Sequence, residues 1–519
     1  MRGGQFKTVH VPRVRRNKMD MSNDKRLTCD PFYLYPIMCE KCIPGDSWKI
    51  ANELVVRMNP LVAPIMHEIN AYVHYYFVPN RILWDQWEDF ITGGRDGRFV
   101  ADLPRWDPDT ITDFSAEEGS LWDYCFGHAM AANETPIKYP EIWPIRAYNM
   151  IWNEYYRDQN IIDEVPLDEQ LSPSKGLRKR AWEKDYFTSL LPWQQRGDAP
   201  ALPISGTAAF VLPQLPIGST SGSATNFAQF VEGAYGIQGV GATNVAAEDG
   251  ALRLKRYLEG GKVDLSSAST FDVSDLRLAF QIQKFLERNA RAGARYVEFL
   301  KAHFPAWPRD DRLQRPEYIG GSKTPIVVSE VLQTSSTDTT SPQGNMAGHG
   351  LSADRTFCGS YRVQEHGIIL GLLSFLPRTM YQQGIDRQWL CESKYDYYFP
   401  EFASLSEQAV YTEELYNYGP SPQDNVLGYQ GRYDEYRFRR NMVHGQFRSV
   451  FSYWHMGRIF GSVPNLNFDF IYPTDDEITA IKRVLAVPTE PMFLVAFGNV
   501  NTAIRPMPWM AEPGLIDHH

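Results

Sequence analysis

The chain has 519 residues, with 52 Lys and Arg against 62 Asp and Glu, and 43% of its residues are hydrophobic. This composition excludes intrinsic disorder and collagen-like repetition, and it supplies enough apolar side chains for at least one large core. The net charge of −10 argues against a protein that wraps nucleic acid with its whole surface, because each phosphate contact needs a cation.

The N-terminus is the most basic part of the chain. Residues 1–26 contain eight Lys or Arg against Asp20 and Asp24, with little apolar content. We therefore expect residues 1–30 to form a basic, extended arm, which either contacts a polyanion or is simply solvated. No apolar segment follows the first residues, so the sequence does not predict a secretory signal. Six dispersed cysteines indicate a reducing compartment rather than a disulfide framework.

Strand patterns come next. Residues 54–56 form a short apolar run, and residues 71–77 alternate between apolar and polar or aromatic side chains, both typical of strands. Apolar residues at helical spacing then predict an amphipathic helix over 81–91, closed by Gly93 and Gly94. We expect residues 80–200 to be a region of large structured loops and helix.

The clearest change in composition lies between residues 197 and 250, where 27 of 54 residues are Gly, Ala, Ser or Thr. Such a segment cannot easily build its own core, so we expect residues 198–274 to be a variable surface insertion. Ser274 can cap a helix, and an apolar stripe follows it. Residues 275–305 are therefore predicted to be helical.

The C-terminal part, residues 325–519, returns to strand patterns. The predicted strands lie at 325–332, 361–376, 396–399, 446–453 and 492–500. Two strand-rich zones separated by a long excursion predict an all-β fold with many long-range pairings.

Motifs for catalysis are absent from the sequence. It contains no phosphate-binding glycine loop, no H-E-x-x-H and no G-x-S-x-G, and its eleven histidines are scattered. We expect no enzyme activity, no metal site and no cofactor.

One segment is a candidate for polyanion binding. If residues 433–440 form a strand, Tyr436 and Phe438 lie on one face and Arg437 and Arg439 on the other. Such a surface could pair with phosphates and stack on bases, or it could be an ordinary half-buried strand with a solvated basic face.

Several blocks of the sequence, in order along the chain, resemble one known family. They are IPGDS (43–47), FVPNRILW (77–84), KDYFTSLLPWQ (184–194), AFQIQKFLER (279–288), RLQRPEYIGG (312–321), QTSSTD (333–338), PQGN (342–345), RPMP (505–508) and PGLIDH (513–518). The chain is identified by them as similar to the major capsid proteins of the Microviridae, single-stranded DNA bacteriophages, and most to the gokushovirus branch. Residues 198–274 show no match, and the N-terminal arm resembles the family only weakly.

The resemblance implies that residues 31–519 form a single eight-stranded antiparallel jelly roll of the viral capsid type, with long inserted loops and a few short helices. It also implies self-assembly into a sixty-subunit T=1 icosahedral shell with pentamer and trimer contacts, built in the bacterial cytoplasm. The implied partners are a packaged circular single-stranded DNA, a small basic internal DNA-binding protein, a minor pilot protein and a host surface receptor. We expect six arginines to face the DNA: Arg13, Arg15, Arg16, Arg437, Arg439 and Arg440.

Two alternatives remain from the residues themselves. A carbohydrate-binding or carbohydrate-cleaving jelly roll would also use many Trp and Tyr with nearby carboxylates. A sequence-specific DNA-binding protein is disfavoured by the net charge and by the lack of a recognisable module.

Overall fold

The computed structural model describes residues 16–92, 99–197, 314–332, 346–419 and 425–510, apart from 132, 133, 135 and 172–174, with short pieces between 209 and 287. The chain divides into two compact units, Met1–Gln194 with Ala290–His519, and Gln195–Asn289. In the second unit β6 (Ala209–Phe210) pairs with β9 (Val263–Asp264) and β7 (Ala228–Gln229) pairs with β8 (Gln238–Gly239). Residues 278–284 and 286–287 are helical, within the helix predicted over 275–305, and the rest of that prediction lies outside the described residues.

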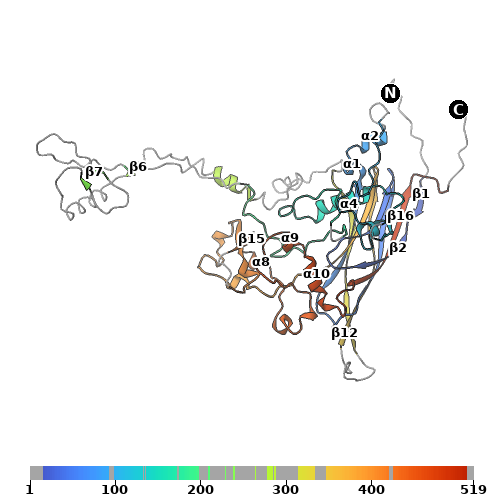
Figure 1. Cartoon of the computed structure of the whole chain (residues 1–519). Helices are drawn as coiled ribbons and strands as arrows, with labels where there is room; N and C mark the ends of the chain where they lie inside the picture. The colour runs from blue at the N-terminus through green and yellow to red at the C-terminus, as the bar shows by residue number, and fades with distance from the viewer. Residues whose placement is uncertain are drawn as a thin grey trace, which may run out of the picture. The chain divides into compact units, whose positions relative to one another are not determined.

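The first unit contains a six-stranded antiparallel sheet (Figure 1). Its strands are β1 (Asn17–Asp20), β2 (Asn23–Cys29), β4 (Ser47–Met58), β11 (Val327–Leu332), β12 (Met346–Arg362) and β16 (Phe493–Arg505). The order is β1-β16-β4-β12-β11, and β2 also pairs with β16, beside β1.

The second sheet has four antiparallel strands in the order β10-β5-β13-β3. They are β3 (Tyr35–Cys42), β5 (Ile69–Pro79), β10 (Glu317–Pro325) and β13 (Gly367–Pro377). The strands predicted at 54–56 and 71–77 lie within β4 and β5, and the one predicted at 492–500 matches β16 from Phe493 on. The predictions at 325–332 and 361–376 each span the end of one strand and a second strand in the other sheet, β10 with β11 and β12 with β13. The all-β fold class is thus confirmed.

Alternating side chains explain how the sheets face each other. In β4 every second residue from Trp48 to Met58 is buried, while Glu53 and Arg57 on the opposite face are exposed. A strand with one apolar face must bury that face against another layer. The layer here is the second sheet: the rings of Phe375 (β13) and Phe493 (β16) stack with centroids 4.2 Å apart.

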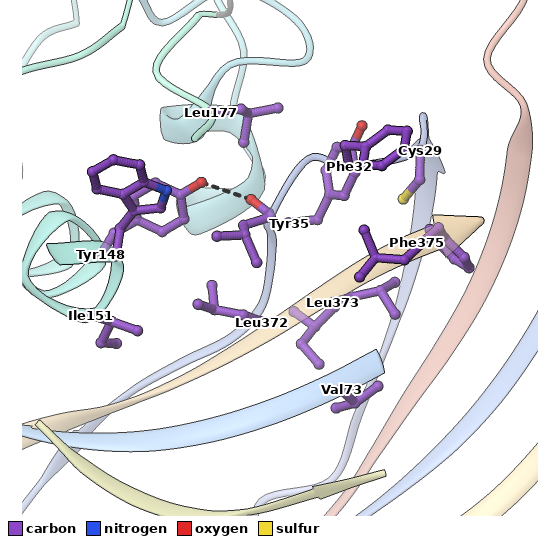
Figure 2. Close-up of a cluster of buried hydrophobic side chains, with 14 of the residues drawn as sticks. Cys29, Phe32, Tyr35, Val73, Tyr148, Ile151, Leu177, Leu372, Leu373 and Phe375 are labelled. Atoms are coloured by element: carbon purple, nitrogen blue, oxygen red, sulfur yellow. Dashed lines mark hydrogen bonds between the residues drawn. The ribbon is translucent and has the colours of Figure 1, made fainter. Parts of the chain in front are cut away.

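The other face of the second sheet is also covered. Every residue of β13 is buried, because α4 (Trp143–Ile151) and nearby loops of the segment between β5 and β10 pack on its outer side. Figure 2 shows Leu373 directed toward Val73 and Leu372 directed toward Tyr148 and Ile151. The Tyr148 hydroxyl donates to the carbonyl oxygen of Leu34 at 2.9 Å, which fixes α4 to the chain entering β3.

Short elements complete the first unit. They are α1 (Asn80–Leu83), α2 (Trp87–Thr92), α3 (Leu121–Phe126), η1 (Trp152–Tyr156), η2 (Arg387–Trp389), η3 (Pro400–Phe402), β14 (Glu407–Tyr411), η4 (Thr412–Glu414), β15 (Val426–Gly431), α8 (Asp434–Arg437), η5 (Gly445–Arg448), η6 (Ser452–Trp454), α9 (Phe468–Ile471), α10 (Asp475–Ile481) and η7 (Lys482–Val484). No described helix has the length and apolar character that crossing a bilayer requires.

Three local predictions are wrong. The helix expected over 81–91 is two helices, α1 and α2, because the backbone at Trp84 is extended and ends the first. Residues 396–399 form no strand, and they lead into the turn η3. Residues 446–453 form the turns η5 and η6, whose backbone groups bond locally, as in the Phe451 N–H to Gln446 carbonyl contact, instead of to a partner strand.

Candidate nucleic-acid interface

A hollow of the first unit lies over the outward face of the six-stranded sheet. The strand register places Arg26 (β2) and Val55 (β4) opposite Ala496 of β16. The next row of the same face holds Thr28 and Arg57 opposite Leu494. Directly paired residues of antiparallel strands share a face, so these side chains form one floor.

Helix α3 and its flanking residues form the wall of this hollow. The Ser120 side chain caps α3 by accepting from the Asp123 N–H, and Gly127 ends it with a left-handed backbone, φ 64°. The Tyr124 hydroxyl donates to the Thr28 carbonyl at 2.8 Å, and Lys25 Nζ donates to the Tyr124 carbonyl at 3.3 Å. These bonds hold the wall against β2, and the space between wall and floor is about 1040 Å³.

Cations outnumber carboxylates in this hollow. Lys25, Arg26, Arg57 and Lys175 line it, against Glu118 and Asp123. Among the described residues, neither Arg26 nor Arg57 forms an ion pair; Arg26 donates only to the neighbouring carbonyl of Lys25, at 3.1 Å. Because the chain as a whole is acidic, such a cluster concentrates positive charge locally.

A second hollow of about 480 Å³ adjoins the first at Phe126, which lines both. It adds Lys41, Arg105 and Lys138 against Glu141. Lys41 and Glu141 form an ion pair at 2.6 Å. We call the two hollows together the basic groove.

Aromatic rings lie within the basic groove. Phe126 is 38% exposed, and its ring is held by edge contacts to Trp106 and Trp122, with centroids 5.4 and 5.2 Å away. Tyr124 also lines the groove, braced against Tyr35 at 5.0 Å. A fixed ring beside unpaired guanidinium groups is suited to stack on a base while the cations meet the phosphates.

Burial keeps the cysteine thiols near the groove in their neutral form. Burial raises the pKa of the Cys125 thiol well above its ordinary value and the pKa of Cys39 to about 12. Both thiols therefore stay protonated at neutral pH. Among the described residues, no group of three or more His, Cys, Asp or Glu is arranged to hold a metal ion.

The predicted DNA-facing arginines are placed as follows. Arg13 and Arg15 lie outside the described residues, and exposed Arg16 donates to the carbonyl of Gly45. The strand expected over 433–440 is wrong, because Tyr433 has a left-handed backbone and α8 begins at Asp434. Strand alternation therefore does not determine which of the side chains in residues 433–440 share a face.

The three C-terminal arginines bond within the chain. Arg437 pairs with Asp434 at 2.5 Å, and Arg439 Nη1 donates to the carbonyl of Glu435 at 2.7 Å. Arg440 donates to the carbonyl of Gly384 at 3.0 Å. Their orientation toward DNA stays a prediction.

Sequence reasoning counted Lys25 and Arg26 in the basic arm but did not find Arg57 or Lys175. Residues 54–56 are apolar throughout, so no local alternation places Arg57 on a polar face. Nothing local could have brought it beside Leu494, which is more than four hundred residues away in sequence.

The fold and the surface define a class: a two-sheet β protein with a basic groove on its surface. Residues 4–515 match the family described as capsid protein (F protein). The chain is 34% identical to capsid protein VP1 of Chlamydia phage 1, over 98% of this chain and 97% of that protein. It is 34% identical to capsid protein VP1 of Bdellovibrio phage phiMH2K, over 97% of this chain and 95% of that protein. It is 30% identical to capsid protein VP1 of Spiroplasma virus 4, over 98% of this chain and 96% of that protein.

The chain therefore belongs to the phage capsid F-protein family. It is a structural major capsid protein of the Microviridae and a component of the virion, not an enzyme.

Proposed function

We propose that this chain forms a T=1 icosahedral shell of sixty copies around a circular single-stranded DNA, with the basic groove facing the genome. The observation that carries the proposal is the groove itself: the two hollows are lined by seven Lys or Arg and three carboxylates, in a chain whose net charge is −10. A shell needs positive charge only on its inner side.

We further propose that the two sheets form an eight-stranded jelly roll. Four strands of the first sheet, in the order β2-β16-β4-β12, face four of the second, in the order β10-β5-β13-β3. Along the chain the strands alternate between the sheets, except that β5 and β10 are consecutive in the second. That is the path of paired Greek keys, with β1 and β11 as extensions.

The remaining partners are proposals supported by the family assignment. They are pentamer and trimer contacts between copies, a small basic internal protein, a pilot protein, a host receptor and synthesis in the host cytoplasm. Arg13, Arg15, Arg16, Arg437, Arg439 and Arg440 are further candidates for DNA contact, of which Arg437 and Arg439 have side chains 52% and 60% exposed.

The surface insertion proposed for residues 198–274 would serve in host recognition, since its small, weakly charged residues suit an exposed excursion. Deleting it should abolish adsorption while shells still form. Unchanged adsorption of assembled particles would remove this role.

Salt dependence of DNA binding tests the groove. The variant Arg26→Glu/Arg57→Glu loses two unpaired cations, so its affinity for a fluorescent oligothymidylate should fall. The slope of log K against log salt should become shallower by about 1.4, because each phosphate contact on a single strand contributes about 0.7. Fluorescence anisotropy at several salt concentrations measures both.

The matched control is Lys49→Glu, an exposed charge on the same face of β4 that does not line the groove. It should leave the slope unchanged. Equal slopes for the wild type and the double variant would contradict the assignment of the groove to DNA.

A further inference from the structure

The two sheets of the first unit have four edges, and three of them are protected. An unprotected edge strand offers unpaired N–H and C=O groups to any extended chain, so soluble proteins block their edges. The β1 and β2 edge carries charged side chains, among them Lys18, Asp20, Asp24 and Lys25. The β3 edge is covered by α3.

The β10 edge lies against β12. A side chain at Gly320 would overlap the Cys358 carbonyl, so the two backbones touch there. The Thr324 hydroxyl donates to Asp354 at 2.8 Å, and the Ser352 hydroxyl donates to the Pro325 carbonyl at 2.9 Å. This edge has no room for another strand.

The fourth edge, β11, is different. It pairs with β12 from Val327↔Leu351 to Leu332↔Met346 and ends its sheet. In the described part of the chain, no backbone bond reaches its other side. Val327, Val331 and Leu332 are 63%, 53% and 48% exposed, and Glu330 is the only charge in the strand.

The ribbon of β11 and β12 also extends the sheet lengthwise. β12 has 17 residues against 12 in β4, and its pairing with β4 begins only at Leu351. Met346 and Leu351 add exposed apolar surface beside β11. An unprotected, apolar edge on a projecting ribbon is a docking surface for a strand.

We propose that β11 pairs antiparallel with β11 of a second copy of this chain, across a two-fold axis of the shell, which joins the six-stranded sheets of two subunits into one. The proposal rests on the proposed shell, because closed icosahedral symmetry supplies two-fold contacts in which the same patch meets itself.

The sequence of β11 suits pairing with itself. Like charges directly opposite each other destabilise a strand pair. In the register that sets Ser329 opposite Ser329, Glu330 faces Val328 and Val327 faces Val331, so the two carboxylates do not oppose each other. The backbone ladder and the valine contacts then both stabilise the pair.

A cysteine scan tests the pairing. Val328→Cys, Ser329→Cys and Glu330→Cys are made singly in the full chain, and purified particles are treated with a mild oxidant. Cβ atoms of directly opposite residues lie roughly 4.5–5.5 Å apart, so at least one variant should form a disulfide dimer on a non-reducing gel. Lys18→Cys, on the charged edge, is the matched control and should stay monomeric, as should the wild type with its native cysteines.

A charge substitution provides the second measurement. Val331→Lys places a charge on the exposed edge, so it should abolish particles while the subunit keeps its wild-type melting temperature. If the wild type forms particles but none of the three cysteine variants forms a disulfide dimer, the proposal is wrong. A normal particle yield from Val331→Lys would also overturn it. Failure of the wild type to form any particle would instead contradict the proposed shell.

Discussion

At the scale of single residues, the contact between the sheets depends on Phe375 and Phe493. Both side chains are fully buried, and their rings stack across the two layers. We predict that Phe493→Ala lowers the free energy of unfolding of the unassembled subunit by about 3–5 kcal/mol, because it leaves a cavity between close-packed layers. Urea denaturation measures the change.

The control for this prediction is Phe357→Ala, which removes the same ring from the solvent side of β12, where it is 63% exposed. Its effect should stay within about 0.5 kcal/mol. Similar losses for the two variants would show that the stacked pair does not join the sheets.

A buried histidine makes stability depend on pH. Burial lowers the pKa of His67 to about 4, assisted by the nearby His455 and Arg483. Its pKa in the unfolded chain is about 6.5, so the unfolded state binds more protons between these values and stability falls as pH drops below about 6.5. From pH 7 to pH 5 we predict a loss of about 2 kcal/mol from this group.

Urea denaturation of the wild type and of His67→Gln at pH 7 and pH 5 measures this loss of stability. The substituted side chain cannot charge, yet its oxygen can still accept from the Met456 N–H, as His67 Nδ1 does at 3.4 Å. The variant should therefore show the smaller pH dependence. The same dependence in both proteins would mean that His67 is not the group responsible.

At the scale of elements, β13 is packed on both faces, by the six-stranded sheet on one side and by α4 with nearby loops on the other. A Cβ at Gly371 would lie 2.7 Å from Tyr75 Cε1 and 3.1 Å from Met38 Cβ, and both neighbours are buried. We predict that Gly371→Ala costs about 1–3 kcal/mol, because the added methyl group overpacks the site. Thermal or urea unfolding should show the shift.

Gly461→Ala is the matched substitution, since a Cβ there meets no atom within 4 Å. It should leave stability nearly unchanged. If both glycines tolerate alanine equally, the second sheet is less tightly packed than the structure indicates.

The strands of the core were predictable because their signal is local. The apolar run of residues 367–376 and the alternation of residues 71–77 each mark a strand without reference to the rest of the chain. Residues 446–453 contain aromatic and β-branched side chains typical of a strand, yet they form the turns η5 and η6, because among the described residues no strand pairs with them.

The candidate site was harder to predict because it depends on register. Arg26 and Arg57 come together only through β16, whose residues 494–496 lie between them. Lys175 lines the same hollow from a loop. The backbone carbonyl of Lys175 accepts a hydrogen bond from the Leu121 N–H at 2.9 Å, which holds this loop against α3. Neither the pairing of the chain ends nor the position of that loop has a local sequence signal, whereas the resemblance to a family supplied the overall function directly.

At the scale of the whole molecule, the described part of a single copy leaves apolar side chains and one sheet edge exposed. The outward face of the six-stranded sheet exposes Val55, Leu351, Phe357 and Leu494 beside its arginines, and among the described residues no strand pairs with the outer side of β11. Antiparallel sheets that face only water usually show polar residues there. An acidic chain with a basic groove and an open edge is consistent with a subunit whose surfaces are completed by DNA on one side and by other copies at its edges.

A cryo-electron microscopy map of the purified particle tests this account most directly. We predict a closed shell of T=1 symmetry in which the groove lined by Arg26 and Arg57 opens toward the packaged DNA. A map in which that groove opens on the outer surface, or a preparation that holds only separate subunits, would contradict it.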